Sequence, residues 1–329
     1  MTRLVLFGAG LAAPPIIEKA SASGQILAIA DNDASKWGTT FHGYPVIPPR
    51  ELTSLCPDRV IISATATFPI YNQLCALGVD SSLIESPLLA HRNRAHWDAL
   101  KASQTGQRIF IVGNGPSLRT SDLQTLHDQR ELSFAFNKIY LAFEETSYRP
   151  SFYLVEDDLV AKNNAKAIRA LTGFQKFFPD YLLPVLGDPD EQTALFYFDV
   201  QRPEDFQPRF SEESLLVHSG YSCTYSALQL AIYMGFREII FIGLDFYFTL
   251  PSQADDEVLT NEAQRNHFAP EYRKQGETWN RPYLDQTREA YILAKQVADR
   301  KGITILNASR SSELDVFPRV EFDSLFEAQ

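Results

Sequence analysis

Cysteine is scarce in this sequence, which limits the kinds of fold and site that it can form. The three cysteines among the 329 residues are Cys56, Cys75 and Cys223, and their spacing suits neither a zinc site nor a disulfide framework. We therefore expect reduced thiols in a cytoplasmic protein, buried as small apolar side chains.

Positive charge is also in short supply. The chain has 30 lysine and arginine residues against 41 aspartate and glutamate residues, which gives a formal net charge of -11 at pH 7. Proteins that bind nucleic acids usually need a basic face that displaces counterions from phosphates, so we expect no nucleic-acid partner.

Long hydrophobic runs are missing as well. No apolar stretch approaches the roughly 20 residues that a membrane-spanning helix needs. The apolar run at residues 4–7 is too short for a signal peptide. We expect a soluble cytoplasmic protein, and the sequence is compatible with peripheral association at the inner membrane face and with a homo-oligomer.

Short apolar runs alternate with amphipathic stretches along the whole chain, which predicts an α/β fold. A chain of 329 residues is longer than one hydrophobic core usually supports. We therefore predict two Rossmann-like domains, each a mostly parallel sheet with flanking helices. The small domain covers residues 1–86, a polar and basic linker 87–106, and the larger domain 107–329. Strands are expected at residues 4–7, 26–30, 60–63, 109–112, 132–136, 151–155, 239–243 and 303–306, and helices at 222–234 and 285–300.

The turn Gly8-Ala9-Gly10 follows the first predicted strand, and Asp31 ends the second. A dinucleotide-binding fold places its glycine turn and ribose-binding acid in these positions. The third glycine is missing, however, and Pro14-Pro15 interrupts the expected start of the helix. Two interpretations stay open, a nucleotide or sugar-nucleotide site and a structural or regulatory turn.

Polar residues follow the strands of the second domain, at the sheet edge where open parallel sheets bind ligands. The turn Gly113-Asn114-Gly115-Pro116-Ser117 suits an anion, because glycine allows close approach and a helix N-terminus follows. It lacks the lysine of a P-loop. The other residues at strand ends are Asn137, Glu156, Asp157, Asp158, Asp245 and Tyr247.

Two further segments could carry chemistry. His218-Ser219-Gly220-Tyr221-Ser222 precedes a helix, so its hydroxyls could contact a ligand or cap that helix. His267 lies in a long polar segment, residues 251–280, which we predict to be a loop or lid. A loop histidine is either a structural residue or, through its near-neutral pKa, a general base.

Residues 3–85 resemble the small Rossmann-like domain at the front of bacterial sugar-modifying enzymes, through Phe7-Gly8-Ala9-Gly10, Asp31-Asn32-Asp33, Trp37-Gly38 and His42-Gly43-Tyr44-Pro45-Val46. Residues 108–310 resemble two related groups. One is the bacterial sialyltransferases that use CMP-activated sialic acid, and the other is the DUF115 family of Maf flagellin glycosyltransferases and MptE-like 6-hydroxymethylpterin diphosphokinases. The motifs occur in the same order: Gly113–Leu118, Phe136-Asn137, His218-Ser219-Gly220, Gly235–Ile240, Gly243–Tyr247 and Asn266-His267-Phe268.

This resemblance implies a sialyltransferase-like domain that performs an inverting, metal-independent transfer of a sugar, such as a nonulosonate, from a CMP-linked donor. The acceptor would be a surface glycan, glycolipid or protein, and no cofactor would be needed. It implies that His267 is the base and that Tyr247 binds the leaving phosphate. The implied substrate-binding residues are Asn114, Gly115, Pro116, Ser117, Asn137, Asp157, His218, Ser219, Gly220 and Asp245.

Two departures keep alternatives open. A second tyrosine expected soon after Tyr247 is replaced by Phe248-Thr249-Leu250-Pro251, and Glu156-Asp157-Asp158 stands where the sialyltransferases carry an asparagine. Asp157 and Asp158, with Asp245, could bind magnesium for pyrophosphoryl transfer from ATP to a hydroxymethylpterin. A non-catalytic module that binds sugar nucleotides is the third hypothesis.

Overall fold

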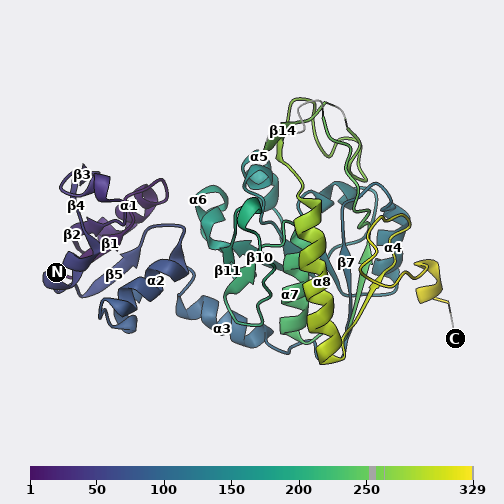
Figure 1. Cartoon of the computed structure of the whole chain (residues 1–329), viewed down its shortest axis with the longest axis horizontal. Helices are drawn as coiled ribbons and strands as arrows, with labels where there is room; N and C mark the ends of the chain where they lie inside the picture. Colours follow the sequence, from purple (N-terminus) through teal and green to yellow (C-terminus); the bar gives the residue numbers. More distant parts are fainter. Residues whose placement is uncertain (252–256, 263, 328–329) are drawn as a thin grey trace. The chain divides into compact units, whose positions relative to one another are not determined.

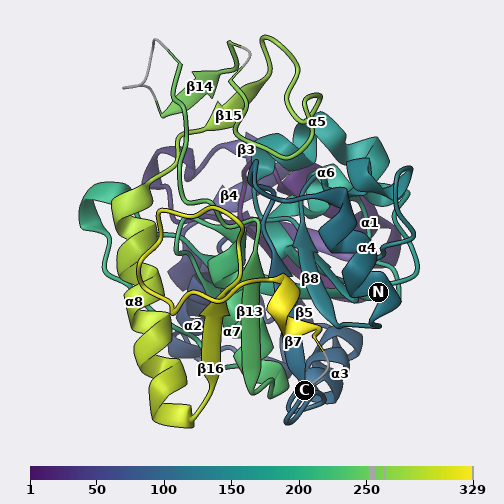
Figure 2. The same cartoon turned by 90° about the vertical axis from the view of Figure 1, so that its right-hand side faces the viewer.

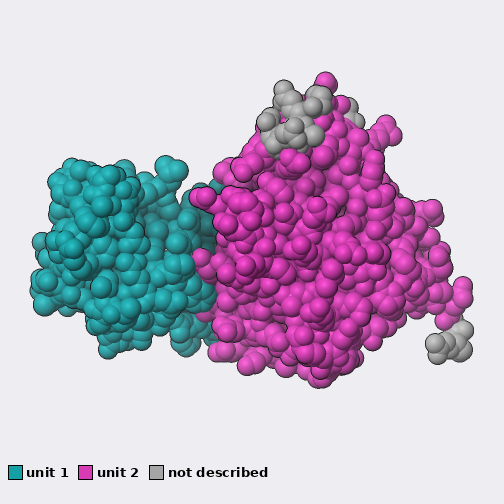
Figure 3. Space-filling model, in the orientation of Figure 1, with its two compact units in different colours: residues 1–95, 180–187 teal, residues 96–179, 188–329 magenta. Residues whose placement is uncertain are grey.

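The computed structural model describes residues 1–251, 257–262 and 264–327, and the chain divides into two compact units. The first unit comprises residues 1–95 and 180–187, and the second comprises residues 96–179 and 188–329 (Figure 3). The division at residue 95 falls inside the segment expected to be a linker. Residues 180–187, expected in the larger domain, pack with the first unit.

The first unit is built on a six-stranded sheet in the order β3-β4-β2-β1-β5-β6, parallel except for the pair β3 and β4. Leu4 and Leu6 of β1 pack on one face and Val5 and Phe7 on the other, so the strand is apolar throughout. The strands are β1 (Arg3–Phe7), β2 (Gln25–Ala30), β3 (Thr40–Phe41), β4 (Tyr44–Ile47), β5 (Arg59–Ile62) and β6 (Ile84–Glu85). The helices are α1 (Ala13–Ser23), α2 (Thr67–Ala76) and the short α6 (Leu183–Leu186).

The glycine turn of the first unit is held by protein groups. Asp31 accepts hydrogen bonds from the backbone N–H of Ala9 at 2.7 Å and of Asp33 at 2.8 Å, and Lys36 Nζ lies 3.1 Å from its carboxylate. A Cβ on Gly8 would lie 2.7 Å from the Cβ of Ala64. This geometry favours the structural interpretation of the turn.

The paired prolines do not interrupt the first helix as expected. Helix α1 begins at Ala13 and places the prolines in its first turn. The backbone N–H groups of a first turn have no intrahelical partner, so proline costs nothing there.

The second unit contains an eight-stranded, wholly parallel sheet in the order β12-β11-β10-β9-β8-β7-β13-β16 (Figures 1 and 2). The predicted α/β fold with two mostly parallel sheets is confirmed. Its strands are β7 (Arg108–Val112), β8 (Ser133–Phe136), β9 (Phe152–Leu154), β10 (Gln175–Pro179), β11 (Thr193–Asp199), β12 (Leu216–His218), β13 (Glu238–Ile242) and β16 (Thr304–Asn307).

The helices predicted at residues 222–234 and 285–300 are both present, and each ends at the glycine that was expected to stop it. Ten of the 12 residues of α7 (Cys223–Met234) are buried, and Gly235 caps it in the left-handed conformation. Helix α8 (Leu284–Lys301) packs beside α7 and ends at Gly302 in the same conformation (Figure 1). The remaining helices are α4 (Thr120–Asp128) and α5 (Asp158–Arg169).

The polar segment predicted as a lid contains a small antiparallel pair, β14 (Val258–Thr260) and β15 (Thr278–Asn280). It lies beside the N-terminal end of α5, where Asn280 Nδ2 is 3.5 Å from a carboxylate oxygen of Asp158 (Figures 1 and 2). We refer to the described residues from 257 to 283 as the lid segment.

The expectation of buried cysteines is wrong for two of the three. Cys56 and Cys75 are exposed, Cys223 is partly buried, and all three are free thiols. In the part of the chain that the structure describes, no helix combines the length and apolarity needed to cross a bilayer.

Helix α3 (His91–Leu100) carries the basic residues that were expected to form a linker. Its Trp97 is 1% exposed and donates a hydrogen bond from Nε1 to the carbonyl oxygen of Leu195 at 2.8 Å. The indole also makes edge contacts with Phe177 and Tyr233. One side chain therefore anchors the C-terminal half of α3 in the second unit.

We predict that Trp97→Phe destabilises the second unit by about 2–4 kcal/mol, because it removes this hydrogen bond and leaves a cavity. Urea unfolding followed by near-ultraviolet circular dichroism measures the loss. The exposed Ala99→Ser on the same helix is the control and should change stability by no more than about 0.5 kcal/mol. Equal stability of Trp97→Phe and wild type would contradict the anchoring role.

Candidate functional site

The carboxyl ends of β7 and β13 form the topological switch point of the large sheet. From β7 the chain runs outward through β8 to β12 and then returns to add β13 on the other side. Open α/β sheets bind ligands at such points. The turn after β7 is Gly113-Asn114-Gly115-Pro116-Ser117, and the turn after β13 is Gly243-Leu244-Asp245.

The two turns are packed backbone against backbone. The N–H of Gly115 donates to the carbonyl oxygen of Gly243 at 2.9 Å. A Cβ on Gly113 would collide with that carbonyl group, and one on Gly243, whose φ is +62°, would lie 2.6 Å from the oxygen of Gly113. Glycine is required here by the packing of the turns as well as by any ligand.

Asp245 binds Ser117 directly. Its carboxylate accepts the backbone N–H of Ser117 at 2.7 Å and also the serine hydroxyl. Burial raises the pKa of Asp245, and the bonds from Ser117 act in the opposite direction. The donors of Ser117, predicted to face a phosphate, are therefore already occupied by a carboxylate.

Asn114 is the residue of the turn that meets the lid segment. Its Nδ2 donates to the carbonyl oxygen of Phe136 and to the hydroxyl of Tyr272, each at 3.1 Å. Its backbone oxygen accepts the N–H of Phe268 at 3.0 Å. Among the described residues, its buried Oδ1 has no hydrogen-bond partner. This orphaned acceptor points to a donor group supplied by a ligand.

His267 lies in the same cluster. Its ring stacks on Tyr272 with centroids 3.8 Å apart and an interplanar angle of 4°. Burial, together with the positive charges of Arg273 and Lys138, lowers the pKa of the imidazole well below its usual value. The histidine is therefore neutral at physiological pH, as a general base must be before it acts.

The end of β8 contributes Asn137 and Lys138. Asn137 has a left-handed backbone, with φ of +51°, and its carbonyl oxygen accepts the hydroxyl of Tyr153 at 2.5 Å. Lys138 is 6% exposed, donates to the carbonyl oxygen of Tyr272 at 2.5 Å and pairs with Glu277 at 2.8 Å. This buried cation holds the lid segment against the sheet.

The acids after β9 are engaged by the protein. Asp157 caps α5 by accepting the N–H of Val160 at 2.9 Å, and Asp158 pairs with Lys162 at 2.6 Å. With Asp245 bound to Ser117, the three carboxylates proposed as magnesium ligands serve separate structural contacts. No group of three or more potential metal-binding side chains occurs within the described ranges. The donor set does not fit a magnesium site.

The turn after β12 is organised by its own contacts. His218 Nδ1 lies 2.9 Å from the carboxylate of Asp199, and the Ser219 hydroxyl accepts the N–H of Tyr221 at 3.3 Å. A Cβ on Gly220 would lie 2.9 Å from the Cβ of Ala290. Among the residues that the structure describes, no hydrogen bond or ring contact joins this turn to Asn114, and the ligand roles of its residues stay predictions.

Tyr247 is 54% exposed. In the described part of the chain its hydroxyl makes no hydrogen bond with the cluster around Asn114. Phe248, the next residue, stacks on Trp279 of the lid segment with centroids 6.2 Å apart. The phosphate-binding role of Tyr247 therefore stays a prediction.

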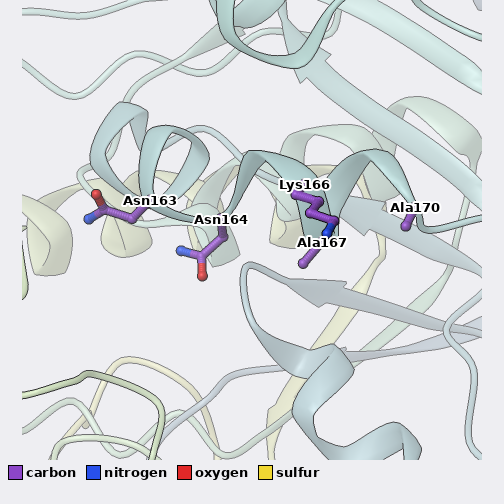
Figure 4. A pocket seen from close by; sticks show the side chains of 5 residues that line it. All are labelled: Asn163, Asn164, Lys166, Ala167 and Ala170. Carbon is purple, nitrogen blue, oxygen red and sulfur yellow. The ribbon is translucent and has the colours of Figure 1, made fainter.

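A shallow hollow of 410 Å³ lies along α5, away from these residues (Figure 4). Helix α5 departs from helical geometry at Asn164, which lines it. The hollow contains none of the predicted site residues, and its lining consists of Asn163, Asn164, Lys166, Ala167 and Ala170.

Sequence reasoning placed Glu156 at a strand end but did not predict that its carboxyl group is buried. Glu156 accepts the hydroxyl hydrogen of Ser226 in α7 at 2.6 Å, and Cys223 lies at the N-terminus of that helix with its thiol 3.9 Å from Asn137 Oδ1. Sequence reasoning also gave Lys138 no role, although its place directly after a strand end was a usable signal.

The comparisons with known proteins match two separate parts of the chain. Residues 89–250 match the family model described as 6-hydroxymethylpterin diphosphokinase MptE-like. Residues 1–85 match the model of the C2185-like N-terminal domain. The predicted MptE-like resemblance is confirmed. No curated protein matches the chain.

Three solved structures are similar at low identity. A Maf glycosyltransferase from Magnetospirillum magneticum AMB-1 is 14% identical with a TM-score of 0.44, over 98% of this chain and 58% of its own. The sialyltransferase CstII from Campylobacter jejuni, in complex with cytidine-5'-monophosphate, is 12% identical with a TM-score of 0.38, over 66% of this chain and 85% of its own. Its complex with CMP-3FNeuAc gives 13% identity and a TM-score of 0.36, over 65% and 85%.

The buried carboxyl group of Glu156 gives a pH-dependent prediction. Burial raises the pKa of Glu156 to about 7. Since an unfolded glutamate titrates near 4.3, the folded state binds the extra proton between these values and stability falls as pH rises through this range. The loss amounts to about 3 kcal/mol.

We predict that Glu156→Gln removes this component. Unfolding free energies measured from pH 4.5 to 7.5 should show a wild-type loss that the variant lacks. The readout is the difference between the wild-type and variant curves, because the contributions of the other titrating groups are the same in both and cancel. Parallel curves across this range would show that Glu156 is not buried in its protonated form.

Proposed function

We propose that the second unit is a glycosyltransferase that takes a sugar from a nucleotide-activated donor, with CMP as the nucleotide. The meeting of Asn114 and His267 at the switch point carries this proposal. A buried, unpartnered amide oxygen offers a place for a nucleoside hydroxyl or amino group. A neutral imidazole lies in the same cluster, stacked on the tyrosine that binds Asn114.

The donor would lie across the carboxyl ends of β7 and β8, between Asn114 and Asn137. Asn114 Oδ1 would accept a hydrogen bond from the nucleoside, and the left-handed backbone at Asn137 presents its amide at the same edge. Since the donors of Ser117 are bound to Asp245, this serine would shape the turn and leave the phosphate to other residues.

The reaction would proceed by displacement at the anomeric carbon of the donor sugar. The acceptor hydroxyl loses its proton to His267 while its oxygen forms the new glycosidic bond. The bond from the anomeric carbon to the phosphate oxygen breaks, and CMP leaves with the electron pair. Because the acceptor attacks opposite the leaving group, the configuration inverts.

The acceptor would approach from the side of Tyr247 and the lid segment. Tyr247, Leu250 and Val258 are exposed to 54%, 37% and 48%, an unusual set of exposed apolar side chains in this chain. Such a surface suits a glycan, glycolipid or protein acceptor, whose sugar rings or side chains present apolar faces.

Pyrophosphoryl transfer to a hydroxymethylpterin is the second candidate, favoured by the description of the matching family model. It would place magnesium near Asp157, Asp158 and Asp245. These carboxylates cap a helix, pair with a lysine and bind a serine, respectively, so they would have to abandon those contacts.

We predict that CMP raises the melting temperature to the same extent with and without magnesium. Ligand at 100 times its dissociation constant should stabilise the folded state by about 2.7 kcal/mol. Thermal shift with CMP, CDP, UDP, ATP and NAD measures the preference, and Asn114→Ala should abolish the CMP shift. Stabilisation by ATP with magnesium alone would support the diphosphokinase instead.

We further predict that His267→Phe lowers kcat by about 10²–10⁴-fold while leaving CMP affinity unchanged. Phenylalanine preserves the stack on Tyr272 and removes the base, so it separates catalysis from packing. Because the pKa of His267 lies well below 6.5, wild-type kcat/KM should stay constant as pH falls through 6.5. Retained transfer by the variant would exclude His267 as the base.

A further inference from the structure

A partly buried arginine of the lid segment feels the charges of Asp157 and Glu277 but forms no ion pair with either. Arg273 stacks its guanidinium on the ring of Trp279, 3.9 Å from the centroid. Within residues 1–251, 257–262 and 264–327, no carboxylate lies within ion-pair distance of it and its guanidinium donates no hydrogen bond. A guanidinium carries five N–H donors, so removing it from water without acceptors is costly.

The surroundings of Arg273 are those of the candidate site. The hydroxyl of its neighbour Tyr272 accepts a hydrogen bond from Asn114 Nδ2, and the positive charge of Arg273 acts on His267. The carboxylate of Asp157, at the end of β9, acts on Arg273 in turn. Arg273 therefore lies near His267 and Asp157, beside the cluster around Asn114.

The indole N–H of Trp279, which stacks with Arg273, is a second hydrogen-bond donor without an acceptor in the part of the chain that the structure describes. Trp279 is 3% exposed, and its indole Nε1 has no hydrogen-bond partner among the described residues. Buried indole N–H groups usually find an acceptor. Two unsatisfied donors on stacked side chains favour a ligand that is anionic and rich in acceptor oxygens.

The Gly113–Ser117 turn has too few free hydrogen-bond donors to bind an anionic ligand by itself. The N–H and hydroxyl groups of Ser117 are bound to Asp245, and the N–H of Gly115 is bound to Gly243. Lys138, the other buried cation of the cluster, is paired with Glu277. Arg273 is the cation of this cluster that keeps its hydrogen-bonding capacity for a ligand.

We infer that Arg273 is the anion-binding residue of the lid segment and that it binds the phosphate of the nucleotide donor. This inference rests on the proposed function, and it assigns to the lid the contact that the Gly113–Ser117 turn was expected to make. The stack on Trp279 fixes the plane of the guanidinium, so two N–H groups can meet two phosphate oxygens side by side.

The test compares CMP with cytidine, which lacks the phosphate, by isothermal titration calorimetry. Wild type should bind CMP more tightly than cytidine. Arg273→Gln should reduce this preference by about 10- to 100-fold and leave cytidine affinity within about two-fold of wild type. Arg273→Lys should fall between them, because lysine keeps the charge and loses the planar fork.

Arg265→Gln is the matched control, since Arg265 is an exposed arginine of the same lid segment. It should leave both affinities unchanged. An unchanged CMP preference in Arg273→Gln would overturn the inference while leaving the proposed function intact. Loss of cytidine binding in that variant would make Arg273 structural. Failure of wild type to bind either ligand would overturn both proposals.

Discussion

The organisation of the second unit depends on the close backbone contact between the turns that follow β7 and β13. Gly113 and Gly243 meet with no room for a Cβ, and this contact places Asp245 beside Ser117. Asn114 is thereby directed away from Asp245 and toward β8 and the lid segment. One steric constraint at the switch point thus separates the half of the turn that is bound to Asp245 from the half that contacts β8 and the lid segment.

The cluster around Asn114 also concentrates positive charge in an acidic protein. Lys138 and Arg273 lie within reach of His267, although the chain carries a formal net charge of -11. The net charge describes the chain as a whole and says nothing about a small desolvated cluster. Under the proposed function, the two cations there would favour anionic ligands, because their fields are poorly screened by water.

The sequence predicted eight strands, the glycine caps at Gly235 and Gly302 and the polar residues at strand ends, because burial and turn chemistry leave periodic and local signals. It did not predict β10, β11 and β12 of the large sheet. It could not predict partners. Ser117 was expected to donate hydrogen bonds to an anionic ligand. Only the fold shows that these donors bind the carboxylate of Asp245, 128 residues later in the chain. Likewise, the pairing of His218 with Asp199 leaves no mark in either local motif.

The position of Arg273 links donor binding to the strength of the base. Burial and the positive charges of Arg273 and Lys138 lower the pKa of His267. Glu277 pairs with Lys138, and the charges of Glu277 and Asp157 also act on Arg273. A phosphate bound to Arg273 would offset the charge that Lys138 and Arg273 impose together, and the pKa of His267 would rise toward its ordinary value. Because proton transfer is most effective when the pKa of the base lies near the working pH, the phosphate of the bound donor would also strengthen the base that deprotonates the acceptor hydroxyl.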